Sequence, residues 1–199
     1  MGSKPKCIIV TGQAGSGKTT LSKKLGERLW LPVVSRDEIK QGYVNTFGIS
    51  HDQLPPETDR IVTDFFFDVV DQHLAAQVSI IIEAAFQHKV WEFRMPKILE
   101  LAAPLIVLCS IDPILAARRH LERGLEQPER ELYHDDNRVR HYRKTGEFLY
   151  PANYDPPKFD IPTIEVSTDG EYIPSINEIV SVARSEGERT NFDPAVVPA

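Results

Sequence analysis

The stretch at residues 8–29, IIVTGQAGSGKTTLSKKLGERL, constrains the fold more than any other part of the sequence. An apolar run leads directly into a glycine-rich turn, and leucines then recur every four residues, at Leu21, Leu25 and Leu29. This spacing is typical of one face of an amphipathic helix. A buried strand, a tight turn and a helix are therefore expected in succession, with the N-terminus of the helix facing the turn.

The turn satisfies the pattern G-x-x-x-x-G-K-[ST], which indicates a phosphate-binding loop. Its glycines permit a backbone path that aims successive amide N–H groups inward, and the helix that follows adds the positive end of its dipole. Lys18 is placed for the β- and γ-phosphates, and the hydroxyl of Thr19 for Mg²⁺. The expected nucleotide-binding residues are Gly12, Gln13, Ala14, Gly15, Ser16, Gly17, Lys18, Thr19 and Thr20. The alternative is a glycine-rich turn without a ligand.

The rest of the chain alternates between strand-like and helix-like segments. Apolar runs predict strands at residues 6–11, 31–35, 78–86, 104–111 and 161–168. Helices are expected after the loop, from near Asp37, at 58–77, at 89–102 with a break or start at Pro96, from Asp112-Pro113 to about Gly124, around 136–146, and at 174–185. This order predicts a three-layer α/β/α domain with a five-stranded parallel sheet in the order 2-3-1-4-5.

The predicted domain covers residues 1–185, and the polar residues 186–199 are expected to form a flexible tail. The content of hydrophobic residues, 41% of 199, is enough for one core. A net charge of −6 argues against sequence-blind binding to nucleic acid. Because no apolar stretch approaches the roughly 20 residues of a membrane span, we expect a cytoplasmic protein without a membrane partner or an obligate protein partner.

The absence of two motifs from the sequence limits the classes of nucleotide-binding protein to which the chain could belong. A GTPase would need the base-reading tetrapeptide Asn-Lys-x-Asp, which the chain lacks. A working ATPase usually has an apolar strand that ends in Asp or Asp-Glu, whereas the third strand here ends in Glu83-Ala-Ala. The chain is also short for a motor, so phosphoryl transfer is favoured.

Two acids are expected at the carboxyl ends of strands, where ligands of such sheets bind. Asp37, in the segment SRDEIK, lies across the cleft from the loop and is the candidate general base for an acceptor hydroxyl. Its alternative role, shared with Ser35, is to cap the helix that begins there. Glu83 is a candidate to hold Mg²⁺-bound water, substrate hydroxyls or a lid arginine, and the alternative is a structural salt bridge.

The helix from Asp112 and the polar residues after it predict a mobile lid at about 113–147. Arg118, Arg119, Arg123 and Arg130 supply the cations that phosphoryl transfer needs. Arg119 and Arg123 share a helix face, and the alternative is a solvated face with i,i+4 pairs. The basic segment RVRHYRK (138–144) fits a phosphate-bearing or nucleic-acid acceptor, or again a solvated face. His51, His88, His134 and His141 are expected on the surface.

Six blocks resemble, in order, those of P-loop kinases grouped as AAA-type kinases, among them polynucleotide 5′-hydroxyl kinases, chloramphenicol phosphotransferase and zeta-toxin-like kinases. The blocks are IIVTGQAGSGKTTLSKKL, VVSRDEIK, SIIIEAAF, LIVLCSIDPILAARRHLERG, YDPPKF and PTIEVSTDG. The resemblance implies a nucleoside-kinase-like fold with a helical lid, and ATP with Mg²⁺. Lys40 departs from the arginine that relatives often carry, and a lysine cannot make the same bidentate fork.

The resemblance and the residues together predict an ATP-dependent kinase that transfers the γ-phosphate to a hydroxyl of a small molecule. The expected catalytic residues are Lys18, Asp37, Arg119 and Arg123, the substrate-binding residues Asp37, Lys40 and Glu83, and the Mg²⁺ ligand Thr19. A polynucleotide 5′-hydroxyl kinase and a non-catalytic ATP-binding regulatory module are the alternatives.

Overall fold

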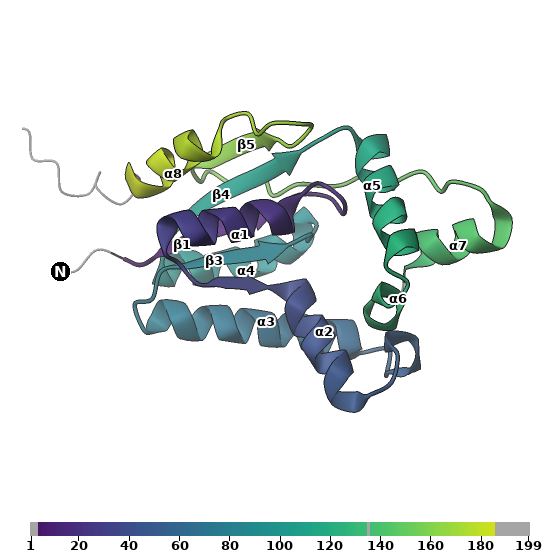
Figure 1. Cartoon of the computed structure of the whole chain (residues 1–199). Coiled ribbons are helices and arrows are strands. Elements are labelled where there is room, and N and C mark those ends of the chain that lie inside the picture. The colour runs from purple at the N-terminus through teal and green to yellow at the C-terminus, as the bar shows by residue number, and fades with distance from the viewer. Residues whose placement is uncertain (1–3, 135, 186–199) are drawn as a thin grey trace, which may run out of the picture.

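The computed structural model describes residues 4–134 and 136–185 and contains one parallel sheet (Figure 1). The strand order is β2-β3-β1-β4-β5, so the predicted order 2-3-1-4-5 is confirmed. All four neighbouring pairs are parallel. The strands are β1 (Lys6–Thr11), β2 (Val33–Ser35), β3 (Ile80–Ala84), β4 (Ala103–Ser110) and β5 (Thr163–Ser167).

Helices cover both faces of the sheet, which explains the unbroken apolar run of β1. Cys7 and Ile9 pack into a core beneath α3 (Thr58–Ala75) and α4 (His88–Leu101). Ile8 and Val10 point to the opposite face and pack beneath α1 (Lys18–Leu29) and α8 (Ile176–Ser185). The three-layer α/β/α architecture is therefore confirmed.

Two residues that were expected to interrupt helices lie inside them. Pro96 sits within α4, which continues because Met95 and Ile98 beside it are buried in the core. Gly124 lies within α5 (Pro113–Glu126) rather than at its end. A Cβ on Gly124 would lie 2.4 Å from Cγ2 of Val139, so the glycine serves the close packing of α5 against another helix. The helix therefore ends at Glu126, two residues beyond the expected stop near Gly124.

The remaining helices stand at the carboxyl ends of the strands, where Figure 1 shows α5, α6 and α7 opposite α2. They are α2 (Arg36–Phe47), α6 (Arg130–Tyr133) and α7 (Asn137–Thr145), with a short 3₁₀-helix at His51–Gln53. The sequence predicted α7 but not α6. No helix within 4–134 and 136–185 is long and apolar enough to cross a membrane. The predicted tail, 186–199, lies outside the described residues.

The close contact between Gly124 and Val139 predicts a strong coupling between these two positions. Gly124→Ala should lower the free energy of unfolding by about 1–3 kcal/mol, because the new methyl group overlaps the valine. In a Val139→Ala background the same change should be neutral or stabilising, since space is now available and alanine favours the helix. Urea unfolding of the four proteins in this cycle measures the coupling. Additive effects would show that the two helices do not pack as described.

Candidate active site

The phosphate-binding loop lies directly against β4 and α5. Gly12 has φ of 145°, and a Cβ there would lie 2.5 Å from the carbonyl oxygen of Cys109. Gly15 has φ of 84°, and its Cβ would lie 2.0 Å from the carbonyl oxygen of Ala116. Both positions therefore require glycine, by conformation and by space. The loop is held at a fixed distance from the first turns of α5.

Two polar side chains inside the loop are buried in a way that suits a bound phosphate. Lys18 is 6% exposed, and its ammonium donates to the carbonyl of Gln13 at 2.8 Å. Burial lowers the pKa of Lys18, an effect that the nearby Glu83 carboxylate opposes. The hydroxyl of Ser16 is buried without a hydrogen-bond partner among the described residues. The ammonium, this hydroxyl and the N-terminus of α1 together fit the phosphates of a nucleotide.

Glu83 is the penultimate residue of β3, beside the loop, and is almost fully buried. Its Oε2 accepts a hydrogen bond from the hydroxyl of Ser35 at 2.7 Å and lies 3.5 Å from the hydroxyl of Thr19. Burial raises the pKa of Glu83, while Lys18 and the Ser35 hydrogen bond act in the opposite direction. Mg²⁺ prefers oxygen ligands and usually takes only one or two from the protein, so Thr19 and Glu83 fit this ion.

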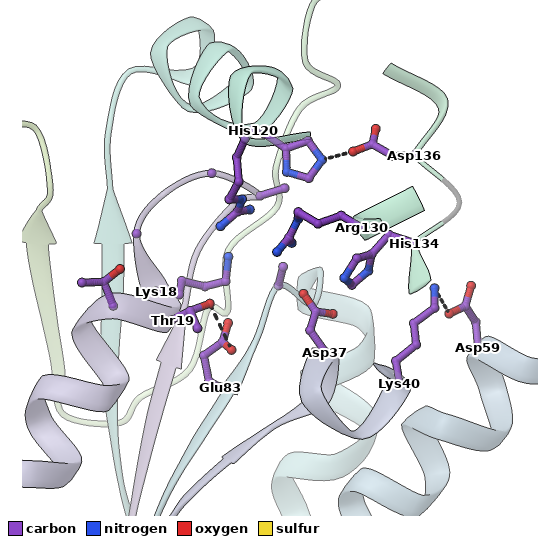
Figure 2. Close-up of a pocket in the computed structure, with 16 residues that line it drawn as sticks. Lys18, Thr19, Asp37, Lys40, Asp59, Glu83, His120, Arg130, His134 and Asp136 are labelled. Carbon is purple, nitrogen blue, oxygen red and sulfur yellow. Dashed lines mark hydrogen bonds and ion pairs between the residues drawn. The ribbon is translucent and has the colours of Figure 1, made fainter. Parts of the chain in front are cut away.

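A cavity of about 360 Å³ opens above the loop and brings most of the predicted site residues together. Figure 2 shows the loop on one side, Asp37, Lys40 and Asp59 on the other, and His120, Arg130 and Asp136 above. The sequence-predicted site residues that line this cavity are Ala14, Gly15, Gly17, Lys18, Thr19, Thr20, Asp37, Lys40, Glu83 and Arg123. Residues from four separate parts of the chain thus share one cavity, as the strand order requires.

Arg119 lies outside this cavity. It lines a second hollow beside the loop, together with Thr168 and Tyr172. Its guanidinium donates to the carbonyl of Thr168 at 3.0 Å and lies 3.5 Å from the carboxylate of Asp169. Arg123 lines both spaces. The two arginines share a helix face, as expected, but only Arg123 reaches the cavity above the loop.

Arg123 is half-buried between the loop and α6. Burial lowers its pKa, and the nearby cation Arg130 lowers it further. The Nε of Arg123 is buried and finds no partner in the described part of the chain. A partly buried guanidinium with an unpartnered N–H group can bind an anion, such as a transferring phosphoryl group.

Asp37 is the second residue of α2, and about half of its side chain is exposed towards the cavity. Its nearest cation is Arg36, at 3.6 Å. Ser35 occupies the N-cap position of α2, but no side chain makes the capping hydrogen bond. The capping interpretation of Ser35 and Asp37 is therefore wrong: Ser35 bonds to Glu83 instead, and Asp37 points to the cavity (Figure 2).

Five residues that the sequence did not point to also line the cavity: Asp59, Ala85, His120, His134 and Asp136. Nε2 of His120 lies 2.5 Å from the carboxylate of Asp136, whose other oxygen accepts from the amide of Arg138 at 3.1 Å and so caps α7. The position of Asp136 at the start of the predicted helix indicated a helix cap. Nothing in the sequence marks its pairing with His120.

His134 was expected on the surface, and that expectation was wrong. It lies at the end of α6, half-buried against the cavity, with its Nε2 3.4 Å from the side-chain amide of Gln41. Burial lowers its pKa to about 4, with further lowering from Arg130 and Lys40 and opposition from Asp37. The ring is therefore neutral at pH 7.

Comparison with known proteins agrees with this geometry. A family model described as an AAA domain matches residues 7–145. A candidate kinase from Chloroflexus aurantiacus is 23% identical, with 94% of this chain and 98% of that chain covered and a TM-score of 0.71. An APS kinase from Mycobacterium tuberculosis, solved with AMPPNP and APS, is 15% identical over 94% and 99% of the two chains, with a TM-score of 0.56. A gluconokinase from Sinorhizobium meliloti is 15% identical over 95% of each chain, with a TM-score of 0.50. No match was found among curated proteins.

The sheet order and the loop together define an α/β protein of the P-loop class. Because the family model spans most of the sequence, the chain belongs to the AAA domain family. The resemblance to P-loop kinases is confirmed. The similarity to each solved structure, at less than 25% identity, shows a shared fold.

The lowered pKa of His134 predicts an acid-dependent loss of stability. The folded state keeps the ring neutral down to about pH 4, whereas the ordinary value is 6.5. Between these values the unfolded chain binds more protons, so the free energy of unfolding falls as the pH drops. In His134→Gln this fall should be shallower across the same window. Urea unfolding at several pH values measures the difference, and parallel curves for the two proteins would contradict the assignment.

The double role of Asp136 predicts that it contributes more to stability than an ordinary capping residue. Asp112 caps α5 through the amides of Ile114 and Leu115 and has no histidine partner, so it is the matched control. Asp112→Ala should lower the free energy of unfolding by about 1 kcal/mol. Asp136→Ala should lower it by about 2–3 kcal/mol, because the hydrogen bond to His120 is also lost. Equal losses would assign Asp136 to capping alone.

Proposed function

We propose that this protein is an ATP-dependent kinase that transfers the γ-phosphate to a hydroxyl of a small-molecule acceptor, with Asp37 as general base. The observation that carries the proposal is the position of Asp37. Its carboxylate lines the same cavity as Lys18 and Arg123 but comes from the opposite wall. A hydroxyl placed between these walls would have a base on one side and a phosphate site on the other.

The donor side of the site belongs to the loop and α5. Its amides and Lys18 would hold the β- and γ-phosphates, and Thr19 with Glu83 would hold Mg²⁺, which supplies charge neutralisation when bound. The hollow around Arg119 and Tyr172 is contiguous with the loop through Gly15 and Gly17. We assign it to the base and ribose of ATP.

On the acceptor side, the chemistry needs a proton acceptor and a cationic clamp. Asp37 takes the hydroxyl proton as the acceptor oxygen bonds to the γ-phosphorus and the bond from that phosphorus to the bridging oxygen breaks. Arg123 and Arg130 balance the negative charge that spreads over the transferring group. Both arginines line the cavity above the loop.

The lid would keep water away from the reaction. The hydroxyl of Tyr133 donates to the side chain of Asn45 at 3.1 Å, so α6 reaches across to α2. Closure of this kind lets the acceptor hydroxyl, rather than water, receive the phosphate. Hydrolysis of ATP would then be slow without an acceptor.

Of the alternatives, a polynucleotide 5′-hydroxyl kinase is less well supported. The basic segment 138–144 would have to contact the nucleic acid. Arg143 is instead engaged by the lid itself, at 2.7 Å from Glu131 and 3.5 Å from the carbonyl of Gly124. The net charge of −6 also disfavours a polyanionic acceptor.

The base assignment predicts that Asp37→Asn loses turnover while it keeps its affinity for ATP. The expected fall in kcat is about 10²–10⁴-fold, because the amide cannot accept the proton. Glu38→Gln is the matched control, since Glu38 is the next residue but pairs with Lys23 at 2.9 Å and does not line the cavity. ADP release with an acceptor gives the turnover, and calorimetric titration with AMPPNP gives the affinity.

Normal turnover of the Asp37→Asn variant would remove Asp37 from the mechanism. A protein that binds ATP but transfers no phosphate to any hydroxyl would support the regulatory module instead.

A further inference from the structure

We infer that the acceptor is a small, non-aromatic polyol, and that Asp59 and Lys40 recognise its hydroxyl groups at the far end of the cavity. This inference rests on the proposed function. It goes beyond it by assigning a chemical class to the acceptor and a specificity role to Asp59, which no motif marks.

Asp59 lies in the first turn of α3 and faces the cavity beside Lys40 (Figure 2). Its Oδ1 accepts from Lys40 Nζ at 3.0 Å and from Arg36 Nη2 at 2.6 Å, and lies 3.8 Å from Nε2 of His51. All three contacts end on the same carboxylate oxygen, Oδ1. The cations are largely buried, at 6% and 14% exposure, whereas the Asp59 side chain is 55% exposed. The two buried cations thus fix the position of the Asp59 carboxylate, and the carboxylate stays accessible from the cavity.

This arrangement matches the chemistry of neighbouring hydroxyl groups. Each hydroxyl both donates and accepts, so a carboxylate and an ammonium side by side can satisfy two of them at once. The neutral ring of His134 lines the same end of the cavity; its Nε2 faces Gln41, so Nδ1 is the ring nitrogen left for a hydroxyl. Asp37 is then left for the hydroxyl that reacts.

The other walls of the cavity are unsuited to an aromatic acceptor. No Phe, Tyr or Trp is among the described residues that line it, and Ala14 and Ala85 are its only apolar side chains there. Flat rings are normally held by aromatic or broad apolar surfaces. The volume of about 360 Å³ lies near the lower end for ligand pockets and is shared with a phosphoryl group. Small size and dense hydrogen bonding are therefore favoured over stacking.

The test is an ADP-release panel with the full chain, ATP and Mg²⁺. The polyol arm contains D-ribose, D-glucose, myo-inositol and D-gluconate. The comparison arm contains uridine, 4-nitrobenzyl alcohol and a 5′-hydroxyl oligonucleotide. We expect turnover in the polyol arm only, with the gluconate and glucose results distinguishing an anionic from a neutral polyol.

Asp59→Asn then tests the recognition role on the best polyol. The KM for that polyol should rise by about 10-fold or more, because a carboxylate acceptor becomes an amide. The affinity for AMPPNP should be unchanged. Asp64→Asn is the matched control, since Asp64 lies on the same helix and pairs with Arg94, away from the cavity. It should leave the KM unchanged. Thermal denaturation of both variants separates recognition from a merely structural clamp between α2 and α3.

Preferential turnover of uridine, the aromatic alcohol or the oligonucleotide would overturn the inference, as would an unchanged polyol KM in a folded Asp59→Asn protein or no turnover with any polyol. An aromatic acceptor whose phosphorylation needs Asp37 would leave the kinase proposal standing while this inference fails. ADP release that is independent of every acceptor would instead count against the proposed function.

Discussion

The arrangement of the site depends on the contact of the phosphate-binding loop with two consecutive elements, β4 and α5. The backbone of Gly12 lies against the carbonyl of Cys109, and that of Gly15 against the carbonyl of Ala116, with no room for a Cβ at either place. This contact fixes the start of α5 relative to the loop. It therefore determines where Arg119, Arg123 and His120 lie, one to two helical turns further on.

Charge is arranged around this fixed point in two layers. Next to the loop, Lys18 and Glu83 are buried close together, so each favours the charged form of the other against the effect of burial. Farther out, Asp37 and Asp59 stay about half exposed on the opposite wall. Groups proposed to hold a nucleotide are thus enclosed, and groups proposed to meet an acceptor remain accessible, which is the division that a transferase needs.

The sheet, its strand order and the loop could be predicted because local signals specify them: apolar runs, leucines at helical spacing and a glycine pattern with one physical use. The lid was harder to predict. Gly124 reads locally as a helix end, yet its packing against Val139 keeps it inside α5. His134 and Asp59 join the site through tertiary placement of α6 and α3, and polar residues at such places look the same in sequence as surface residues. Asp37 and Glu83 could be placed at this edge of the sheet from the sequence because they lie at the carboxyl ends of β2 and β3, whereas Lys40 was expected there only from the family resemblance.

In the proposed reaction, phosphate passes from ATP to a hydroxyl and not to water. Phosphorus-31 NMR of a reaction with ATP, Mg²⁺ and the best acceptor tests this most directly, since ADP, inorganic phosphate and a phosphomonoester give separate signals. We expect one equivalent of phosphomonoester for each ADP and little inorganic phosphate. One equivalent of inorganic phosphate for each ADP, with no phosphomonoester, would contradict it.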